Sequence, residues 1–277
     1  MTNTMKGTAL ITGATDGVGR VVATRLGKDG WHVLVHGRNR ERGEQVVAEI
    51  AQSGGTAEFI TADLASLAEV RRLADEVNRR IAQSGGRLQL LVNNAGIGTA
   101  GGGRQRQESA DGHELRFAVN YLAGFLLTRL LLPLLKAGKP SRIVNVSSGG
   151  QQAIEFDDVM LTKGYSGMRA YCQSKLAQIL FTIDLAEELA GSGVIVNALH
   201  PSTYMDTTMV RAAGVTPVSK VETGAEAILQ LAISPELDGR SGLYFNVMTE
   251  SRANAQAYDA AARRQLRTLS LKLADLR

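Results

Sequence analysis

The sequence predicts an α/β fold, a doubly wound sheet of seven mostly parallel strands with helices on both of its faces. Short apolar, β-branched runs alternate with longer helical segments along the chain, as expected for strand–helix–strand units. Runs such as "RIVNV" (142–146) and "VIVNAL" (194–199) are apolar at nearly every position, which is typical of strands buried on both faces. No linker, repeat or change of composition interrupts this pattern, so we expect a single domain over residues 1–277.

Each strand is expected where a short apolar run is followed by a loop or by a helix signal. The strands cover residues 8–13, 32–37, 57–63, 88–96, 141–150, 194–201 and 242–247. The helices cover residues 17–30, 41–54, 66–82, 110–138, 168–193, 221–233 and 252–276, with an irregular stretch before residue 220. Ser66 is the expected N-cap of the third helix, Gly54 and Gly55 end the second, and Pro133 lies near the end of the fourth. This order of elements is typical of a Rossmann-like sheet.

Composition places the chain among ordinary globular proteins, with 44% hydrophobic and 21% charged residues and a net charge of +4. Acidic and basic residues are interspersed, so we expect no nucleic-acid partner. The single cysteine, Cys172, excludes an internal disulfide and favours a reducing compartment. The N-terminus lacks the apolar run of a signal peptide, and the apolar segment 125–135 contains Arg129 and Pro133. We therefore expect a cytoplasmic protein without a membrane span.

A glycine-rich turn, "TGATDGVGR" (12–20), lies between the first strand and the first helix. Glycines at this place let the backbone turn tightly and approach a pyrophosphate, which the helix N-terminus then binds. The turn therefore predicts a dinucleotide site whose ligands include Gly13, Thr15, Asp16, Gly17, Val18, Gly19 and Arg20.

The end of the second strand indicates which nicotinamide cofactor is used. A carboxylate there would bind the ribose hydroxyls of NAD, whereas an arginine accommodates the 2′-phosphate of NADP. The sequence reads "VHGRNRERG" (35–43), with Arg38 in place and no acidic residue before it. We therefore expect NADP(H) in preference to NAD(H), with Arg20 as a second basic group.

Tyr171 and Lys175 lie one turn apart in the apolar segment "AYCQSKLAQILF" (170–181). Residues four apart are neighbours on a helix surface. An ammonium beside a phenol favours the phenolate and lowers the tyrosine pKa, which suits a general acid and base. The alternative is an ordinary Tyr–Lys pair on a half-exposed face.

Together these stretches resemble the short-chain dehydrogenase/reductase family, and within it the retinol-dehydrogenase-like and protochlorophyllide-reductase-like branches. The resemblance runs from Thr8 to about Val247 and keeps the family's order of motifs. The motifs are "TGATDGVG", "ADL" (62–64), "NNAG" (93–96), "FAVNYLAGFLLT" (117–128), "NVSS" (145–148), "YCQSK" (171–175) and "HPS" (200–202).

The resemblance implies a role for each matching residue. Tyr171 would be the general acid and base, Lys175 would tune it and bind the nicotinamide ribose, and Ser148 would bind the substrate oxygen. Asn120 would hold a water that links Lys175 to solvent. Residues 1–150 would form the cofactor half and 141–277 the catalytic half. The remaining cofactor contacts would come from Asp63, Leu64, Asn93, Asn94, Ala95, Gly96, Pro201, Ser202 and Thr203.

Several assignments stay open at this point. Ser147 is an alternative to Ser148, and Tyr121 and Cys172 are expected to be packing residues. "PST" stands where the family usually has Pro-Gly, which leaves the register of the following loop uncertain. The loops 98–112, 149–170 and 203–220 would form the substrate pocket. Arg104 and Arg106 would attract an anionic substrate or simply be solvated, and an apolar lining would come from Met160, Met205, Met209 and Val210.

The expected function is hydride transfer between NADP(H) and a carbonyl or alcohol, on a small to medium apolar aldehyde or ketone. Reduction of a C=C bond or epimerisation on the same scaffold is an alternative within enzymes. A non-catalytic NADP(H)-binding sensor is an alternative of another class, although it would have no need of a general acid. A homo-oligomer and a monomer both remain open, and we expect no metal ligand cluster.

Overall fold

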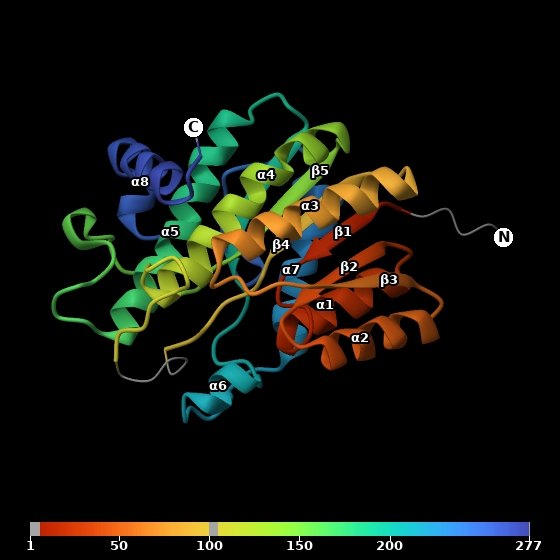
Figure 1. The fold of residues 1–277 in the computed structure, drawn as a ribbon, viewed down its shortest axis with the longest axis horizontal. Coiled ribbons are helices and arrows are strands. Elements are labelled where there is room, and N and C mark those ends of the chain that lie inside the picture. Colours follow the sequence, from red (N-terminus) through yellow and green to blue (C-terminus); the bar gives the residue numbers. More distant parts are fainter. Residues whose placement is uncertain (1–5, 100–104, 277) are drawn as a thin grey trace.

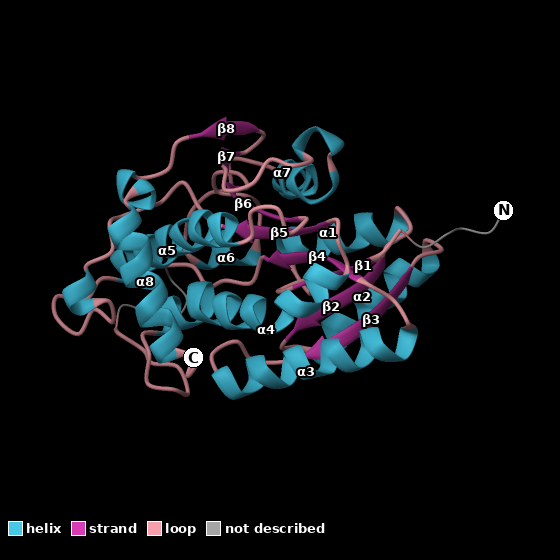
Figure 2. Cartoon of the chain, turned by 90° about the horizontal axis from the view of Figure 1, so that it is seen from above, coloured by secondary structure: helices cyan, strands magenta, loops and turns pink. Residues whose placement is uncertain are grey.

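An eight-stranded sheet runs through the molecule in the order β3-β2-β1-β4-β5-β6-β7-β8 (Figures 1 and 2). The computed structural model describes residues 6–99 and 105–276. The strands are β1 Thr8–Ile11, β2 His32–Gly37, β3 Thr56–Thr61, β4 Leu88–Asn93, β5 Ser141–Val146, β6 Val194–His200, β7 Tyr244–Asn246 and β8 Thr249–Ser251. Strands β1 to β7 pair in parallel, and β8 pairs antiparallel with β7 at the edge. The predicted fold class is confirmed, with β8 as an additional strand.

Helices cover both faces of the sheet, as Figure 1 shows. They are α1 Gly17–Lys28, α2 Arg40–Gln52, α3 Leu67–Ser84, α4 Ala123–Ala137, α5 Gly167–Glu188, α6 Thr208–Ala212, α7 Val221–Ile233 and α8 Ala260–Leu273. Helices α3, α4 and α5 pack on one face and α1, α2 and α7 on the other, so that the apolar residues form two buried clusters. The predicted N-cap Ser66 is confirmed, because its side chain accepts a hydrogen bond from the Glu69 amide.

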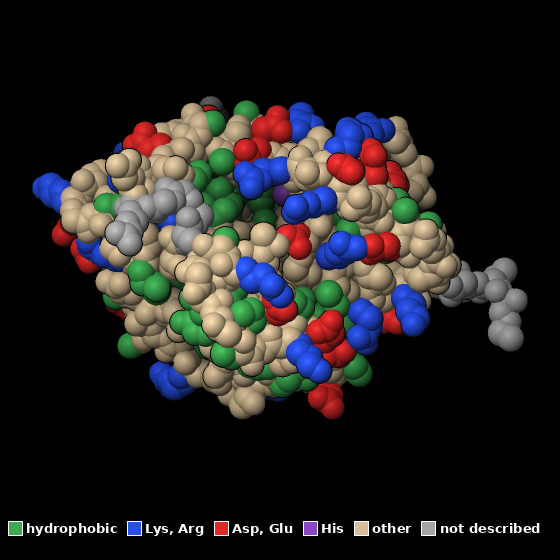
Figure 3. Space-filling view, turned by 90° about the horizontal axis from the view of Figure 1, so that it is seen from below, with side chains coloured by type: hydrophobic (Ala, Val, Ile, Leu, Met, Phe, Trp, Pro, Cys, Tyr) green, Lys and Arg blue, Asp and Glu red, His purple; other side chains and the backbone are tan. Residues whose placement is uncertain are grey.

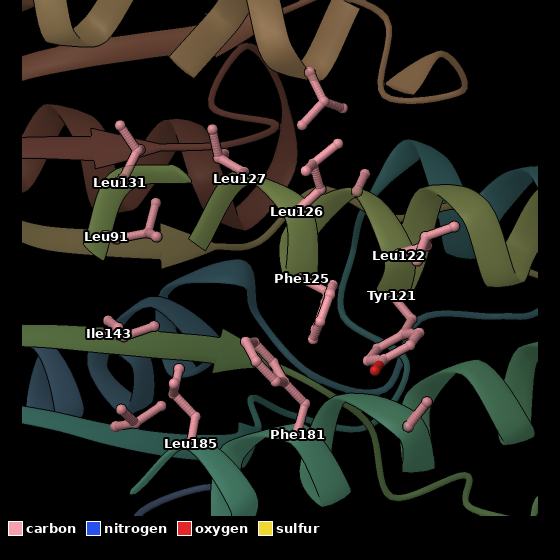
Figure 4. Packing of buried hydrophobic residues seen from close by; sticks show 14 of the residues in the cluster. Leu91, Tyr121, Leu122, Phe125, Leu126, Leu127, Leu131, Ile143, Phe181 and Leu185 are labelled. Atoms are coloured by element: carbon pink, nitrogen blue, oxygen red, sulfur yellow. The ribbon is translucent and has the colours of Figure 1, made fainter. Parts of the chain in front are cut away.

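Aromatic residues fill the space between α4 and α5 (Figure 4). The rings of Phe125 and Phe181 lie 5.1 Å apart, and the ring of Tyr121 lies 6.1 Å from that of Phe125. The Tyr121 hydroxyl is 2.7 Å from the Ser270 hydroxyl, which ties α8 to the same core. Tyr121 is therefore a packing residue, as predicted, and α8 covers the outer side of α5.

The fourth helix begins later than residue 110, where the sequence analysis placed its start. Glu108 and Glu114 form an isolated bridge around a turn, and the Asp111 carboxylate accepts a hydrogen bond from the Leu67 amide at the start of α3. A π-helical turn, Phe117–Leu122, then leads into α4. By length and composition the helical segment Phe117–Ala137 is able to cross a membrane, and 67% of its most apolar window is buried within the protein.

The strand order reverses between β1 and β4. At such a switch point the helices that follow the two strands lie on opposite faces, and a crevice opens at the carboxyl ends of the strands. The loops after β1, β4, β5 and β6 all lie at this end of the sheet. They carry the glycine turn, "NNAG", Ser148 and Pro201, so the topology gathers the predicted motifs at one edge.

Candidate active site

The glycine turn bends tightly between β1 and α1. Gly13 and Gly17 have φ angles of 64° and 53°, a region that favours glycine. A Cβ atom at Gly19 would lie 2.4 Å from the Gly13 carbonyl oxygen and 2.4 Å from Asn94 Nδ2. Asp16 caps α1 by accepting a hydrogen bond from the Gly17 amide. Without side chains at these glycines, the backbone amides at the N-terminus of α1 are open to a ligand. Such a helix N-terminus can bind a pyrophosphate.

Two side chains from neighbouring strands hold this turn in place. Asn94 Nδ2 donates to the carbonyl oxygens of Thr12 and Gly13 at 2.8 and 3.1 Å. His36 Nδ1 accepts a hydrogen bond from the Gly13 amide at 3.3 Å, while Nε2 lies 3.2 Å from the Ala62 carbonyl oxygen. Burial lowers the pKa of His36 to about 4, so the ring is neutral and Nε2–H is the donor. From the sequence alone we interpreted His36 as a surface residue, which is wrong, because it is 2% exposed and lies within the buried strand β2.

Basic side chains lie beside the end of β2. Arg38 is exposed and its guanidinium is 4.0 Å from the Asp63 carboxylate, while Arg42 is 3.5 Å from the Asp16 carboxylate. Arg20, which was also predicted to bind the cofactor, instead forms a two-pronged ion pair with Glu49 of α2. Arg38 and Arg42 are therefore the basic pair at this edge, and Arg42 was not predicted.

Some of the predicted cofactor residues that follow β3 and β4 lie beside the glycine turn, whereas others have side chains in the core. Asn93 is buried and its amide donates to Thr128 Oγ1 and Asn145 Oδ1, so its side chain belongs to the core and not to a ligand site. The prediction for Asn93, made from its place in the motif alone, therefore does not hold for its side chain. Three other predicted residues also have side chains that pack inward. Thr15 lies against Gly37, and Val18 and Leu64 are buried. Ala95 and Gly96 remain beside the glycine turn and Lys175, respectively.

Asn120 lies in the π-helical turn, a feature that often marks functional positions. Its Oδ1 accepts from the Ile97 amide at 2.7 Å, and its Nδ2 donates to the Ile97 carbonyl and to Ser174 Oγ. A Cβ atom at Gly96 would lie 3.2 Å from Asn120 Oδ1 and 3.5 Å from Lys175 Nζ. Asn120 therefore fixes the loop after β4 against α5, close to the lysine.

Ser148 is the serine that faces the phenol. Its Oγ accepts from the Gly150 amide at 3.0 Å and hydrogen-bonds to the side chain of Tyr171. Ser147 instead donates to the Lys175 carbonyl oxygen, which removes it as an alternative. The Ser148 carbonyl oxygen accepts hydrogen bonds from the Tyr244 hydroxyl and from the Gln151 side-chain amide, so the loop after β5 is held from both sides.

The buried Lys175 lies over the Tyr171 ring, with Nζ 5.8 Å from the ring centroid. Burial raises the pKa of Tyr171, and the hydrogen bond from Ser148 offsets part of that rise. Among the protein's own groups, burial is the largest influence on the Tyr171 pKa and acts in the opposite direction to the predicted lowering. A raised pKa favours the protonated phenol, which is the form that donates a proton.

The loop after β6 lies beside this pair. His200 contacts Gly149 and its Nε2 is 3.1 Å from Thr203 Oγ1, while burial and the charge of Lys175 lower its pKa. Ser202 donates to Ser219 Oγ, so the "PST" turn is closed by the far end of its own loop. Pro201 is buried beneath it.

Helix α6 lies over the glycine turn, in a segment predicted to be irregular. Thr208 donates to the Asp16 carboxylate at 2.8 Å, and Met209 contacts Gly98. Figure 3 views the molecule from the side on which α6 lies in Figure 1. It shows a hollow lined by hydrophobic side chains, with Lys and Arg side chains at the rim. Met209 is exposed, whereas Met205 packs against Gly224 of α7.

A second cluster of polar side chains, Glu114, Arg116 and Tyr165, lies at the outer edge of the site. Arg116 and Glu114 are almost fully buried, and Tyr165 bridges them by hydrogen bonds of 2.6 and 3.0 Å. Arg106 donates to the Met160 carbonyl and pairs with Glu108, so it is engaged by the protein itself. The predicted Arg104 lies outside the described residues.

A glycine turn at the switch point, with Ser148 after β5 and Tyr171 and Lys175 on α5 beside it, is the arrangement of an α/β oxidoreductase that binds a dinucleotide. The profile of the short chain dehydrogenase family matches residues 7–216. Retinol dehydrogenase 13 of Mus musculus is 37% identical over 292 aligned positions, covering 97% of this chain and 84% of that protein. The chain therefore belongs to the short chain dehydrogenase family, in its retinol-dehydrogenase-like branch. Members of this family are oxidoreductases that use nicotinamide cofactors.

Solved structures agree with this assignment. A protein of Mycobacterium paratuberculosis superposes with a TM-score of 0.79 at 29% identity, over 98% of this chain and 94% of that chain. Landomycin C-6 ketoreductase LanV, solved with NADP and rabelomycin, superposes with a TM-score of 0.70 at 26% identity. That alignment covers 88% of this chain and 96% of LanV.

Proposed function

We propose that the chain is an NADP(H)-dependent oxidoreductase that interconverts a carbonyl and an alcohol on a small to medium apolar substrate. The observation that carries this proposal is the placement of the Tyr171 phenol beside Ser148, with Lys175 Nζ 5.8 Å from its ring centroid. A protein that only binds a cofactor has no need of a proton donor held in this way. The site lies at the switch point, where a nicotinamide dinucleotide fits the bare glycine turn.

When bound, the reduced nicotinamide would supply a hydride to the carbonyl carbon. Tyr171 would give its proton to the carbonyl oxygen, and the Ser148 hydroxyl would donate a hydrogen bond to the same oxygen. In the reverse direction the Tyr171 phenolate would take the proton of the alcohol. Lys175 would stabilise that phenolate by its charge and bind a ribose hydroxyl.

The preference for NADP(H) is supported by Arg38 and Arg42. Both are exposed, Arg38 just after β2 and Arg42 in the first turn of α2, and no carboxylate precedes Arg38 in β2. An arginine there suits a 2′-phosphate, and LanV, a similar fold, was solved with NADP. The apolar substrate class is supported by the hollow lined with hydrophobic side chains (Figure 3) and by the names of the relatives, which act on retinol or are ketoreductases.

The test is oxidation of NADPH followed at 340 nm with a panel of apolar aldehydes, ketones and enones. Tyr171→Phe should lower kcat by about 10²–10⁴-fold, because general acid catalysis contributes that much, and should leave NADPH binding nearly unchanged. Tyr258→Phe is the matched control, since Tyr258 is an exposed tyrosine that hydrogen-bonds the Ala253 amide. Wild-type turnover in Tyr171→Phe would refute the assignment, and an enone product that keeps its carbonyl would indicate C=C reduction.

A further inference from the structure

The side chain of Lys175 has a partner that the proposed reaction does not account for. Nζ donates to the Val146 carbonyl oxygen at 2.9 Å and to Gln178 Oε1 at 3.1 Å. Lys175 and Gln178 are 5% and 4% exposed, so both groups are essentially withdrawn from water. Gln178 lies one turn after Lys175 on α5. A buried polar side chain aimed at the ammonium in this way is not needed for packing.

The surroundings of Nζ contain no compensating negative charge among the groups that the structure describes. Tyr171 faces it from the same helix, His200 faces it from β6, and the uncharged Asn120 lies beyond Gly96 in the loop after β4. In the described part of the chain, no carboxylate lies within ion-pair distance of Nζ. Burial alone lowers the pKa of Lys175 to about 7, so its charge is sensitive to pH near neutrality.

We propose that Gln178 is a positioning residue, whose amide oxygen keeps Lys175 charged and directs its remaining N–H toward the reacting groups. An ammonium has three N–H donors, and Val146 and Gln178 accept two of them. One donor is left for the ribose hydroxyl that the proposed function assigns to Lys175, and the inference rests on that function. A neutral amide suits this task because it favours the ammonium without forming an ion pair that would compete for the free donor.

Two substitutions of similar size should act in opposite directions. Gln178→Met removes the acceptor, so the charged form of Lys175 loses a hydrogen bond and its pKa falls. Gln178→Glu places a carboxylate beside Nζ, so the pKa rises. Gln173→Met is the matched control, because Gln173 is also a buried glutamine of α5, and no hydrogen-bond partner for its amide is found among the described residues. A role in packing alone would give the same effect at both positions.

The first readout is the pH profile of kcat/KM, together with the Kd of NADPH measured by fluorescence at each pH. The pKa of Tyr171 is raised from 10, so the first loss of activity above neutral pH belongs to Lys175. We expect Gln178→Met to move this loss of kcat/KM to a pH about one unit lower, and Gln178→Glu to move it to a higher pH. Profiles that coincide with wild type, shifts in the same direction, or an equal shift in Gln173→Met would overturn the proposal.

A second readout does not depend on turnover and so separates this proposal from the proposed function. Because the pKa of Lys175 is about 7 in the folded chain and 10.5 when unfolded, the unfolded chain binds more protons between these values. The free energy of unfolding should therefore rise with pH across this interval. In urea unfolding, the start of this rise should move to lower pH in Gln178→Met and to higher pH in Gln178→Glu. These shifts would support the Gln178–Lys175 pair even if no carbonyl compound were turned over, and their absence would refute the pair.

Discussion

The buried pair of Glu114 and Arg116 allows a sharp test of how the rim of the site is held. The two side chains are 1% and 0% exposed, with Arg116 Nη1 3.7 Å from Glu114 Oε1. The carboxylate also accepts hydrogen bonds from the Tyr165 hydroxyl at 3.0 Å and from the Phe117 amide at 2.7 Å. Glu114→Gln keeps the shape of the side chain and removes its charge. Arg116 then keeps its hydrogen bonds to Tyr165, Gly98 and Thr99 but loses the charge of Glu114 beside it.

Removing one partner of a buried ion pair typically costs about 3–5 kcal/mol. For a chain of this size, about 2 °C in Tm per kcal/mol corresponds to a fall of about 6–10 °C. The Arg106–Glu108 pair nearby provides the control. Its carboxylate is 53% exposed, so Glu108→Gln should cost less than about 1 kcal/mol. The assay is urea unfolding at pH 7 with calorimetry in parallel.

The same substitution should also change catalysis through the loop after β4. Arg116 donates to the carbonyl oxygens of Gly98 and Thr99, at 3.1 and 2.7 Å, so a shift of its guanidinium moves that loop. We expect KM for the carbonyl substrate to rise more than kcat falls. The reasoning is refuted if the free energy of unfolding of Glu114→Gln stays within about 1 kcal/mol of wild type, the loss expected for the Glu108→Gln control. In the double variant with Arg116→Met, the loss should be smaller than the sum of the single losses.

Three further outcomes follow from the cofactor half. Arg38→Ala should raise KM for NADPH by about 10–100-fold, since it removes a charge-assisted hydrogen bond, and should leave KM for NADH unchanged, with the exposed Arg40→Ala as control. Gly19→Ala would place a methyl group 2.4 Å from Asn94 Nδ2, so NADPH binding measured by fluorescence should be lost and Tm should fall. Because the pKa of His36 is about 4 when folded and 6.5 when unfolded, stability should fall by about 3 kcal/mol as the pH drops between these values. His36→Gln should flatten that part of the pH–stability curve, and an unchanged slope would contradict the role given to His36.

The sequence was sufficient for the sheet because its central parallel strands, β1, β4, β5 and β6, are buried at nearly every position and therefore mostly apolar. It also located the catalytic groups, since they follow directly after strands whose carboxyl ends meet at one edge. It missed β8 because its three polar residues, Thr249–Ser251, show no hydrophobic periodicity. It missed α6 because that helix has five residues and is held by contacts with distant segments, such as the bond from Thr208 to Asp16.

Motif position misled the prediction where a side chain turns inward. Asn93 and Asn94 are adjacent in "NNAG", yet Asn93 bonds to Thr128 in the core and Asn94 clamps the glycine turn. Successive side chains alternate around the end of a strand, so only one of the two can face the cofactor cradle. Arg20 was likewise assigned by its place after the last glycine, but Glu49 lies within its reach on α2. Neither partner is close in sequence, and the structure was needed to find them.

The partner of Lys175, by contrast, was within reach of the sequence. At about 100° per residue, positions 171, 175 and 178 lie within roughly 60° of one another on a helix, while position 173 lies on a different side. Tyr171, Lys175 and Gln178 therefore form one stripe of α5, and Gln173 does not belong to it. The stripe was overlooked because the Tyr–Lys spacing was interpreted as a complete catalytic unit. A buried ammonium needs acceptors, however, and the sequence offers one at the next position of the same stripe.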